Sequence, residues 1–410
     1  MPWEPADERA MSEGEPEVVK EEAKDALREP EPAIIENEQD SKPEKVRPRI
    51  KQRVRFLLQD TTLNLVHSDI GGIMMPLTEG GIRHLYAGAR ANVGVKSGRY
   101  LFECKIVELM PPPEDQSRGA PRPRNALRVG VSLAGSPLVM AESSQTSVHF
   151  DSEGAFAASG KRRPVGRKFT NNDVVGILLN LDQGSPNCHT VSLFKNGVRA
   201  SVPLALPDGM KGKPMYPTVS FKAVTVHVNF GPDPLAPLPF ACRMMQDITL
   251  KDAIITSYPE HPEGKGEIVL PVGLPGQGVF DWLDMFLEKN PGYAELSDRA
   301  ILDWAERSGV PRKRPYAERS SNDKPEMGFG LSELEDGSLR SMLKMAARML
   351  PRSIVVMELR SNLVAEKRTE LMAEFPSHLF TKVARVMVGE PTADFKKRAC
   401  ELMLKEKQEK

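Results

Sequence analysis

Apolar and polar residues alternate along much of the first part of the chain. Runs of this kind between residues 46 and 243 place apolar side chains at Tyr100, Phe102, Cys104 and Ile106, and again at Val224, Val226, Val228 and Phe230. A period of two is typical of β-strands that bury one face. Because turn residues recur between the runs and no long amphipathic helix intervenes, the pattern predicts an antiparallel β-sandwich of two sheets over residues 46–243.

One dipeptide predicts a specific hairpin within this sandwich. Asn196-Gly197 separates the apolar run at 191–195 from Val198. A type I′ turn requires positive φ at both central residues, and asparagine and glycine tolerate that conformation best. We therefore expect two antiparallel strands joined by a tight turn at this point.

The pattern changes to an α/β type after residue 267, beyond a predicted linker at 244–266. The apolar run at 268–272 is followed by a glycine-rich turn and by a stretch whose apolar residues share one helical face and which ends at Asn290-Pro291-Gly292. Further apolar runs at 354–357 and 383–388 predict buried strands, and residues 339–350 and 394–404 predict helices. A small parallel sheet with flanking helices is expected over residues 267–410.

The glycine-rich turn has the position of a phosphate-binding loop but not its chemistry. In such a loop a lysine reaches the β- and γ-phosphates and a Ser or Thr hydroxyl holds Mg²⁺. Here the turn reads Gly273-Leu274-Pro275-Gly276-Gln277-Gly278, and Val279 and Phe280 fill those two positions. The sequence therefore predicts a degenerate phosphate loop and no catalytic residue. The glycine amides leave phosphate binding at the helix N-terminus open as an alternative, although a strand-to-helix turn also requires small residues.

Composition narrows the functional classes further. Lys+Arg and Asp+Glu both total 56, so net charge gives no case for nucleic acid or for a membrane. The first 45 residues carry fifteen acidic and six basic residues with few aromatics, which predicts a disordered acidic tail over residues 1–45. No apolar run approaches the roughly 20 residues that span a bilayer. With neither a secretory signal nor an organelle presequence, a nuclear or cytoplasmic protein without a membrane partner is expected.

The cysteines give no indication of a metal site. Cys104, Cys188, Cys242 and Cys400 are spaced too widely for a zinc module or a redox pair. We expect neither a metal nor a cofactor.

Local basic clusters are the candidate binding residues. Alternate positions carry Lys45, Arg47, Arg49, Lys51, Arg53 and Arg55; two connections carry Arg118, Arg122 and Arg124, and Lys161, Arg162, Arg163, Arg167 and Lys168; a later cluster is Arg312, Lys313 and Arg314. An extended segment places alternate residues on one side, so the first set would present its charges together. These clusters predict contacts with RNA or an acidic partner, and solvated charged stretches are the alternative.

A series of motifs in order resembles a SPRY domain. They are Gly94-Val95-Lys96-Ser97-Gly98-Arg99-Tyr100, Arg128-Val129-Gly130-Val131, Lys168-Phe169-Thr170-Asn171, Phe194-Lys195-Asn196-Gly197 and Tyr216-Pro217. Together with Leu85-Tyr86-Ala87-Gly88 and the glycine-rich turn, the series resembles the heterogeneous nuclear ribonucleoprotein U (scaffold attachment factor) family, in which a SPRY domain precedes a polynucleotide-kinase-like P-loop domain. The resemblance implies a nuclear recognition module, not an enzyme, with a protein partner at the SPRY loops.

The chain departs from this family at its nucleotide-handling positions. Besides Val279 and Phe280, alignment on Asn362 puts Leu359 in the family's acidic position and leaves Glu358 one place away. The sequence supports two hypotheses. The first is a non-enzymatic scaffold that binds RNA and/or RNA-processing proteins, with the acidic tail competing for the basic clusters. The second, favoured by the lack of an Arg/Gly-rich stretch, is an adaptor that binds a short peptide and no RNA.

Overall fold

The computed structural model describes most of the chain after the acidic N-terminal region. It covers residues 36, 38–41, 48–68, 71–111, 124–259, 262–274, 276, 278–310, 329, 334, 336–386 and 392–409. Residues 37–410 form one unit and residues 1–36 another, and the description below concerns the former. Seven predicted binding residues lie outside the described residues, namely Lys45, Arg47, Arg118, Arg122, Arg312, Lys313 and Arg314.

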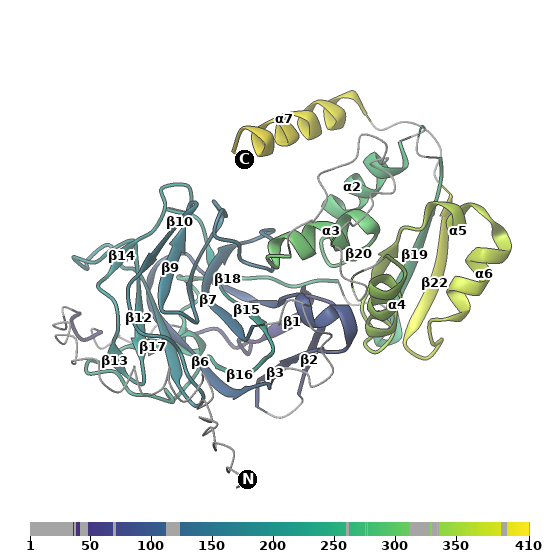
Figure 1. Ribbon diagram of the computed structural model, residues 1–410. Helices are drawn as coiled ribbons and strands as arrows, with labels where there is room; N and C mark the ends of the chain where they lie inside the picture. The colour runs from purple at the N-terminus through teal and green to yellow at the C-terminus, as the bar shows by residue number, and fades with distance from the viewer. Residues whose placement is uncertain are drawn as a thin grey trace, which may run out of the picture. The chain divides into compact units, whose positions relative to one another are not determined.

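Two largely antiparallel sheets form the predicted β-sandwich (Figure 1). The first runs in the order β1 (Phe56–Thr61), β4 (Ala87–Ala91), β15 (Met215–Lys222), β7 (Ala126–Leu133), β8 (Ser147–Asp151), β9 (Ala155–Ala158) and β10 (Lys161–Pro164), with β5 (Val93–Val95) and β18 (Ala253–Ile255) beside this path. The second runs β13 (Val198–Arg199), β12 (Thr190–Lys195), β11 (Val174–Leu181), β6 (Gly98–Leu109), β16 (Val224–Asn229), β3 (Ile73–Pro76) and β2 (Leu65–His67), with β14 (Leu204–Ala205) and β17 (Arg243–Met244) beside it. The predicted sandwich is confirmed.

Strand β6 shows how the alternating pattern fills the core and where it misleads. Its residues Tyr100 and Phe102 are buried in the core between the sheets, as the period of two predicts. Leu101 and Glu103 on the opposite face are buried as well, although the pattern predicts a solvated face there. The reason is a distant segment, residues 235–244, whose first two amides donate hydrogen bonds to the Glu103 carboxylate. The alternation could not reveal a cover that comes from elsewhere in the chain.

The hairpin predicted at Asn196-Gly197 is confirmed. These two residues have φ of 52° and 80°, and the flanking strands β12 and β13 pair antiparallel. Both central residues therefore adopt the left-handed conformation that a type I′ turn requires.

The sandwich extends beyond the predicted boundary at residue 243. Strand β18 pairs antiparallel with β5, and the 3₁₀ helix η2 (Met245–Asp247) leads to it. Met245 and Ile248 are buried in the sandwich core. The first part of the predicted linker at 244–266 is thus structured, because its apolar residues complete that core.

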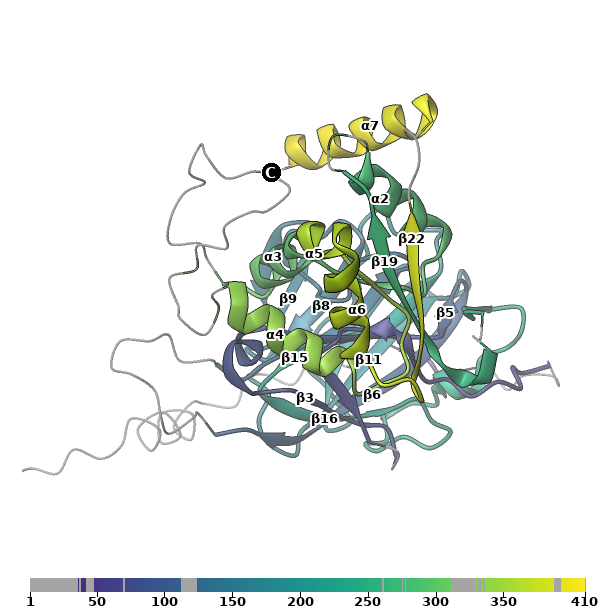
Figure 2. The same cartoon turned by 90° about the vertical axis from the view of Figure 1, so that its right-hand side faces the viewer.

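A parallel four-stranded sheet with helices follows. Its strands are β20 (Ala294–Leu296), β21 (Ile354–Val356), β19 (Gly266–Val272) and β22 (Phe380–Val386), and Figure 2 shows β19 and β22 side by side. The helices are α2 (Val279–Lys289), α3 (Asp298–Arg307), α4 (Asp336–Ala347), α5 (Leu359–Leu363), α6 (Ala365–Ala373) and α7 (Ala393–Glu409), with the 3₁₀ turns η1 (Gly80–His84) and η3 (Pro262–Gly264). The strands predicted at 268–272 and 354–357 are present. The third begins at Phe380, and the sequence pattern misses β20 because it is only three residues long.

The core of the α/β layer includes residues from the sandwich part of the sequence. Ile82 and Leu85 come from the sandwich sequence but pack into the apolar cluster that also contains Ile268 and Leu343. The Trp304 Nε1–H donates to the Tyr86 carbonyl at 2.8 Å, and polar contacts of this kind fix the orientation of a packed surface. The two parts therefore fold against each other within residues 37–410.

Candidate functional site

The turn between β19 and α2, which the sequence predicts to be a degenerate phosphate loop, is followed by a residue that packs in the core. Gly278 has φ of 77° and precedes the first residue of α2, Val279. The Val279 side chain is 1% exposed and lies in a cluster with Val269, Leu283, Val355 and Met357. A residue at this position in a working loop would point its ammonium group at phosphate. In this chain the same position belongs to the core.

The next position is also used for packing. Phe280 is half-buried, and the Arg299 guanidinium lies 5.5 Å from its ring centroid. Burial opposes the charge of Arg299, but hydrogen bonds to Glu295 at 2.7 Å and Asp284 at 2.6 Å raise its pKa. The cation beside Phe280 is therefore already neutralised by two carboxylates.

The three glycines of this turn differ in whether the local geometry requires glycine. Gly278 needs its positive φ, which L-residues rarely adopt. A Cβ on Gly276 would meet no atom within 4 Å, so no steric requirement for glycine exists there. Gly273 is half-buried at the end of β19. Geometry thus accounts for the glycine at 278, and not for the one at 276.

The residues that the sequence predicts at a second nucleotide-handling position make internal contacts as well. Glu358 forms an ion pair with Lys344 on α4. The Asn362 side chain is buried and donates from Nδ2 to the Val356 carbonyl at 2.9 Å. Both side chains hold the α/β layer together.

The basic residues predicted in a connection at 153–168 lie on a β-hairpin instead. Strands β9 and β10 pair through a turn at Ser159 and Gly160, which have φ of 49° and 76°. Short runs of small residues such as those of β9 carry little strand signal, so the pattern missed this hairpin. Strand β10 forms the edge of its sheet, and Lys161, Arg162 and Arg163 are all exposed on it.

The exposed charges on this edge differ in their partners. Arg162 donates from Nε to Asp151 at 2.6 Å, and Arg163 lies 5.7 Å from the ring centroid of Phe156. Of the two basic residues that follow, Arg167 is exposed, and the Lys168 ammonium lies 3.9 Å from Glu153. The edge is positive at Lys161 and Arg163 and partly neutralised at Arg162.

The predicted stripe of alternating basic residues is exposed where it is described. Ile50 and Val54 are buried in the sandwich core, and four residues between and beside them, Arg49, Lys51, Arg53 and Arg55, are exposed. Arg49 forms an ion pair with Asp247. Arg124, the described member of its cluster, is exposed. No observation tests whether any of these residues binds a partner.

Sequence reasoning missed a buried pair of arginines, Arg99 and Arg199. Their side chains are 8% and 2% exposed and lie near the carboxylate of Glu38. This arrangement, named here the Arg99–Arg199 pocket, corrects the prediction that residues 1–45 are disordered throughout, because residues 38–41 bind to the sandwich. A buried strand position filled by arginine was the available signal.

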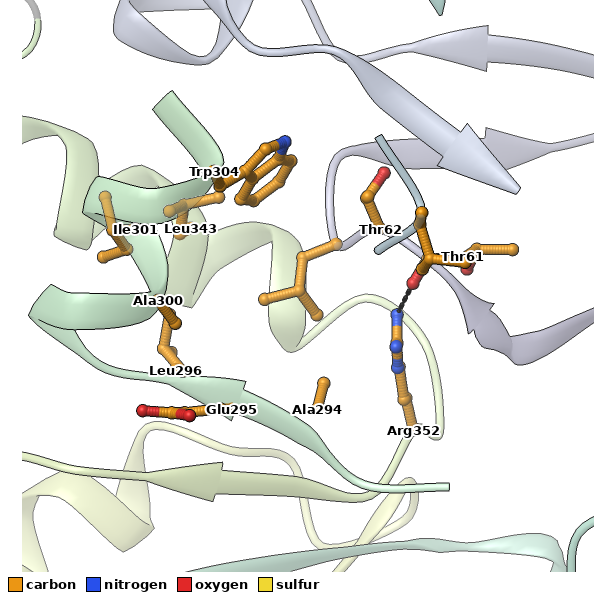
Figure 3. Close-up of a pocket in the computed structure, with 12 residues that line it drawn as sticks. Thr61, Thr62, Ala294, Glu295, Leu296, Ala300, Ile301, Trp304, Leu343 and Arg352 are labelled. Atoms are coloured by element: carbon orange, nitrogen blue, oxygen red, sulfur yellow. Dashed lines mark hydrogen bonds between the residues drawn. The ribbon is translucent and has the colours of Figure 1, made fainter. Parts of the chain in front are cut away.

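A cavity of about 150 Å³ lies between the sandwich and the α/β layer (Figure 3). Trp304, Ile301 and Leu343 line one side, and Arg352 reaches across to the carbonyl of Thr61. Arg352 also donates to the Gln59 carbonyl at 3.1 Å. Burial lowers the pKa of Arg352 to about 10, in spite of the nearby Asp60 charge. No pattern in the sequence predicts this contact.

Two further properties concern the described residues as a whole. None of the described helices is long and apolar enough to cross a membrane. Within the same part of the chain, no three His, Cys, Asp or Glu side chains are grouped as metal ligands would be.

Comparison with known proteins identifies the sandwich. The family described as "SPRY domain" matches residues 123–233. This part of the chain is therefore similar to SPRY domains. The match covers strands β7 to β16, including the basic hairpin β9–β10. A solved structure, the SPRY domain of human HERC1, aligns with 42% of this chain and 96% of that chain, at 21% identity and a TM-score of 0.31.

Curated relatives extend the resemblance. Two curated relatives are the heterogeneous nuclear ribonucleoprotein U-like protein 2 of Homo sapiens and that of Mus musculus. Each is 28% identical to this chain over 244 residues, which is 58% of this chain. The resemblance to the heterogeneous nuclear ribonucleoprotein U family is thereby confirmed. The chain spans about a third of the length of these relatives, 31% in each case.

Proposed function

We propose that this chain is a non-enzymatic scaffold of ribonucleoproteins, which binds RNA and/or RNA-processing proteins through its SPRY domain and basic surfaces. The observation that carries the proposal is the exposed basic edge strand β10 on a SPRY domain whose relatives are named as ribonucleoproteins. The burial of Val279 supports a function without phosphoryl transfer, because no described side chain at the loop supplies the required lysine.

RNA binding of this type is electrostatic. Exposed Lys and Arg side chains neutralise phosphates and release counterions, so affinity falls steeply with salt and depends little on sequence. The β10 edge and the exposed residues Lys51 and Arg53 offer such charges on the sandwich. This mode of binding does not require hydrogen bonds to the base edges of the RNA.

The test is the affinity of the full chain for a labelled generic RNA across a salt series. A variant with Lys161→Gln and Arg163→Gln is expected to bind more weakly and to show a salt slope smaller by about one to two, since the slope changes by about one per lost phosphate contact. A second variant with Arg312, Lys313 and Arg314 changed to Gln tests that predicted cluster in the same way.

A control with the same loss of charge separates local contacts from net charge. Lys211→Gln with Lys213→Gln removes two exposed positive charges from another turn of the sandwich. Its affinity is expected to stay within about two-fold of the wild type, because surface charges are screened beyond a Debye length of about 10 Å. Equal losses in the test and control variants would contradict a specific RNA surface at β10.

A peptide-binding adaptor is the second candidate function. The observation that favours it is the Arg99–Arg199 pocket, which binds the side-chain carboxylate of Glu38 from the same chain. Absence of RNA binding even at low salt, with retained peptide binding, would select this alternative.

Nuclear localisation is part of the proposal, with a cytoplasmic location as the alternative. It rests on the relatives named as nuclear ribonucleoproteins. A fluorescent fusion of the full chain is expected in the nucleus, and a uniform cytoplasmic signal would contradict this part of the proposal.

A further inference from the structure

Residues 38–41 lie on the outer face of the second sheet, with the Glu38 carboxylate held by several side chains of the sandwich. Arg99 Nη1 donates to Oε2 at 2.8 Å and Asn187 Nδ2 donates to Oε1 at 3.0 Å. Asn180 Nδ2 donates to Oε2 at 3.4 Å, and Arg199 Nη2 lies 4.0 Å from Oε1. One carboxylate thus receives contacts from β6, β11, β13 and the connection between β11 and β12.

The backbone of this segment is recognised as well. The Ser41 amide donates to the Ala241 carbonyl at 2.8 Å, and the Ala241 amide donates to Asp40 Oδ1 at 2.7 Å. Arg99 Nη2 donates to the Gln39 carbonyl and to Ser41 Oγ. Contacts to main chain and to two carboxylates together are how a protein surface holds an extended acidic peptide.

The pocket does not depend on the segment for its shape. The Arg99 guanidinium lies 5.3 Å from the ring centroid of Phe240, and that of Arg199 lies 4.7 Å from the ring centroid of Phe194. Asn180 is additionally fixed by a hydrogen bond to Ser185 at 2.9 Å. Side chains positioned by such contacts are preorganised, which favours binding of an incoming ligand.

The occupant itself contributes only polar side chains, Glu38, Gln39, Asp40 and Ser41. Charge and hydrogen bonds hold it, without apolar burial that would lock it in place. A buried guanidinium without an anion is strongly unfavourable, so the pocket requires a carboxylate, but nothing in the contacts restricts that carboxylate to this chain.

We propose that the Arg99–Arg199 pocket is a receptor for an extended acidic segment of a protein partner, with two carboxylates spaced as Glu-x-Asp, and that residues 38–41 occupy it as an exchangeable ligand in cis. This goes beyond the proposed function, since it assigns a partner chemistry to a face of the sandwich remote in sequence from β10. It also holds whether or not the chain binds RNA.

The test uses the full chain and a labelled synthetic peptide with the sequence of residues 34–45. A variant with Glu38→Gln and Asp40→Asn releases the pocket and is expected to bind the peptide at least ten-fold more tightly than the wild type does. A peptide with Gln in place of Glu38 is expected to bind at least ten-fold more weakly to the released variant. Adding Arg99→Gln to that variant is expected to abolish binding, whereas adding Lys213→Gln, which removes an exposed positive charge from another turn of the sandwich, leaves it unchanged.

Equal binding by wild type and released variant, or no binding by a released variant with native circular dichroism, would overturn the proposal. A second measurement on the wild type covers the case in which the released variant fails to fold. Excess unlabelled peptide is expected to accelerate hydrogen exchange of the Ser41 amide at least several-fold, because displacement breaks its bond to Ala241. No acceleration, or acceleration by RNA and not by the peptide, would equally contradict an acidic-peptide receptor.

Discussion

The phosphate loop and the Arg99–Arg199 pocket treat buried charge in opposite ways. At the loop, an apolar Val279 occupies the position of a phosphate-binding lysine and joins the core. On the outer face of the sandwich, two buried guanidinium groups hold a carboxylate. Of these two sites, the pocket in the sandwich has buried charge, whereas the predicted phosphate loop is followed by an apolar residue of the core.

The strongest way to break this comparison is to place a charge in the loop. Val279→Lys is expected to destabilise the full chain by about 3 kcal/mol or more, because an ammonium group would enter an apolar cluster without a partner. It is not expected to create magnesium-dependent ATP hydrolysis, since Phe280 still lacks the hydroxyl. Chemical denaturation and an ATPase assay measure the two effects.

A matched loop variant controls for the added lysine. Leu274→Lys places the same charge at a side chain that is 48% exposed, and its effect is expected within about 0.5 kcal/mol. A gain of ATPase activity in Val279→Lys would show that a lysine at position 279 is sufficient for phosphate chemistry in spite of the apolar packing around it.

Removing a charge from the pocket is the converse experiment. Arg99→Met leaves the buried Glu38 carboxylate short of its strongest donor and is expected to cost about 3 kcal/mol of unfolding free energy. Arg49→Met removes an arginine that is 64% exposed and paired with Asp247, and is expected to cost less than about 1 kcal/mol. Similar losses in the two variants would mean that the pocket is no more buried than a surface ion pair.

The cover over the outer face gives a third, smaller effect. Gly197→Ala is expected to cost about 2 kcal/mol, because the residue has φ of 80° and an added Cβ would lie 2.5 Å from the Pro237 carbonyl oxygen. Gly135→Ala shares a positive φ of 73° but meets no atom within 4 Å, so it isolates the conformational cost of about 1 kcal/mol. Thermal unfolding of the two variants measures the difference in stability. Equal losses of stability would show that residues 235–244 move to accommodate the added Cβ at no energetic cost.

The buried side chain of His149 differs from the arginines of the pocket, because it has no hydrogen-bond partner among the described residues. His149 is 1% exposed, and neither ring nitrogen has a hydrogen-bond partner among the described residues. Burial lowers the pKa of His149 from 6.5 to about 3. Below pH 6.5 the unfolded chain binds a proton there that the folded chain does not, so stability falls by up to about 1.4 kcal/mol per pH unit until the pH approaches 3.

The matched variant for this pH dependence is His149→Gln, which does not titrate. Its unfolding free energy is expected to fall less steeply between pH 6.5 and pH 5 than that of the wild type. Identical slopes would show that folding does not lower the pKa of His149.

The sequence predicts features that depend on neighbours along the chain. The alternation in β6, the turn at Asn196-Gly197 and the loss of loop chemistry at Val279 are local, and each follows from residue type and spacing. The hairpin β9–β10 was not predicted, because its turn, Ser159-Gly160, is not among the strongest hairpin dipeptides and its first strand is short.

Features that depend on residues far apart could not be predicted. Glu38 and Arg99 are 61 residues apart, and Arg352 contacts a carbonyl 293 residues away. A single sequence carries no periodic signal for such pairs. For the same reason, the cover of residues 235–244 over Leu101 and Glu103 became visible only in the structure.

Hydrogen exchange of the full chain tests the central claim most directly, namely that ligand recognition belongs to the sandwich and not to the phosphate loop. The account predicts that generic RNA at low salt protects the β9–β10 hairpin, that the acidic peptide alters exchange at Ser41, and that Mg-ATP leaves residues 273–289 unchanged. Protection of Gly278 and Val279 by Mg-ATP, with no effect of RNA or peptide on the sandwich, would contradict it.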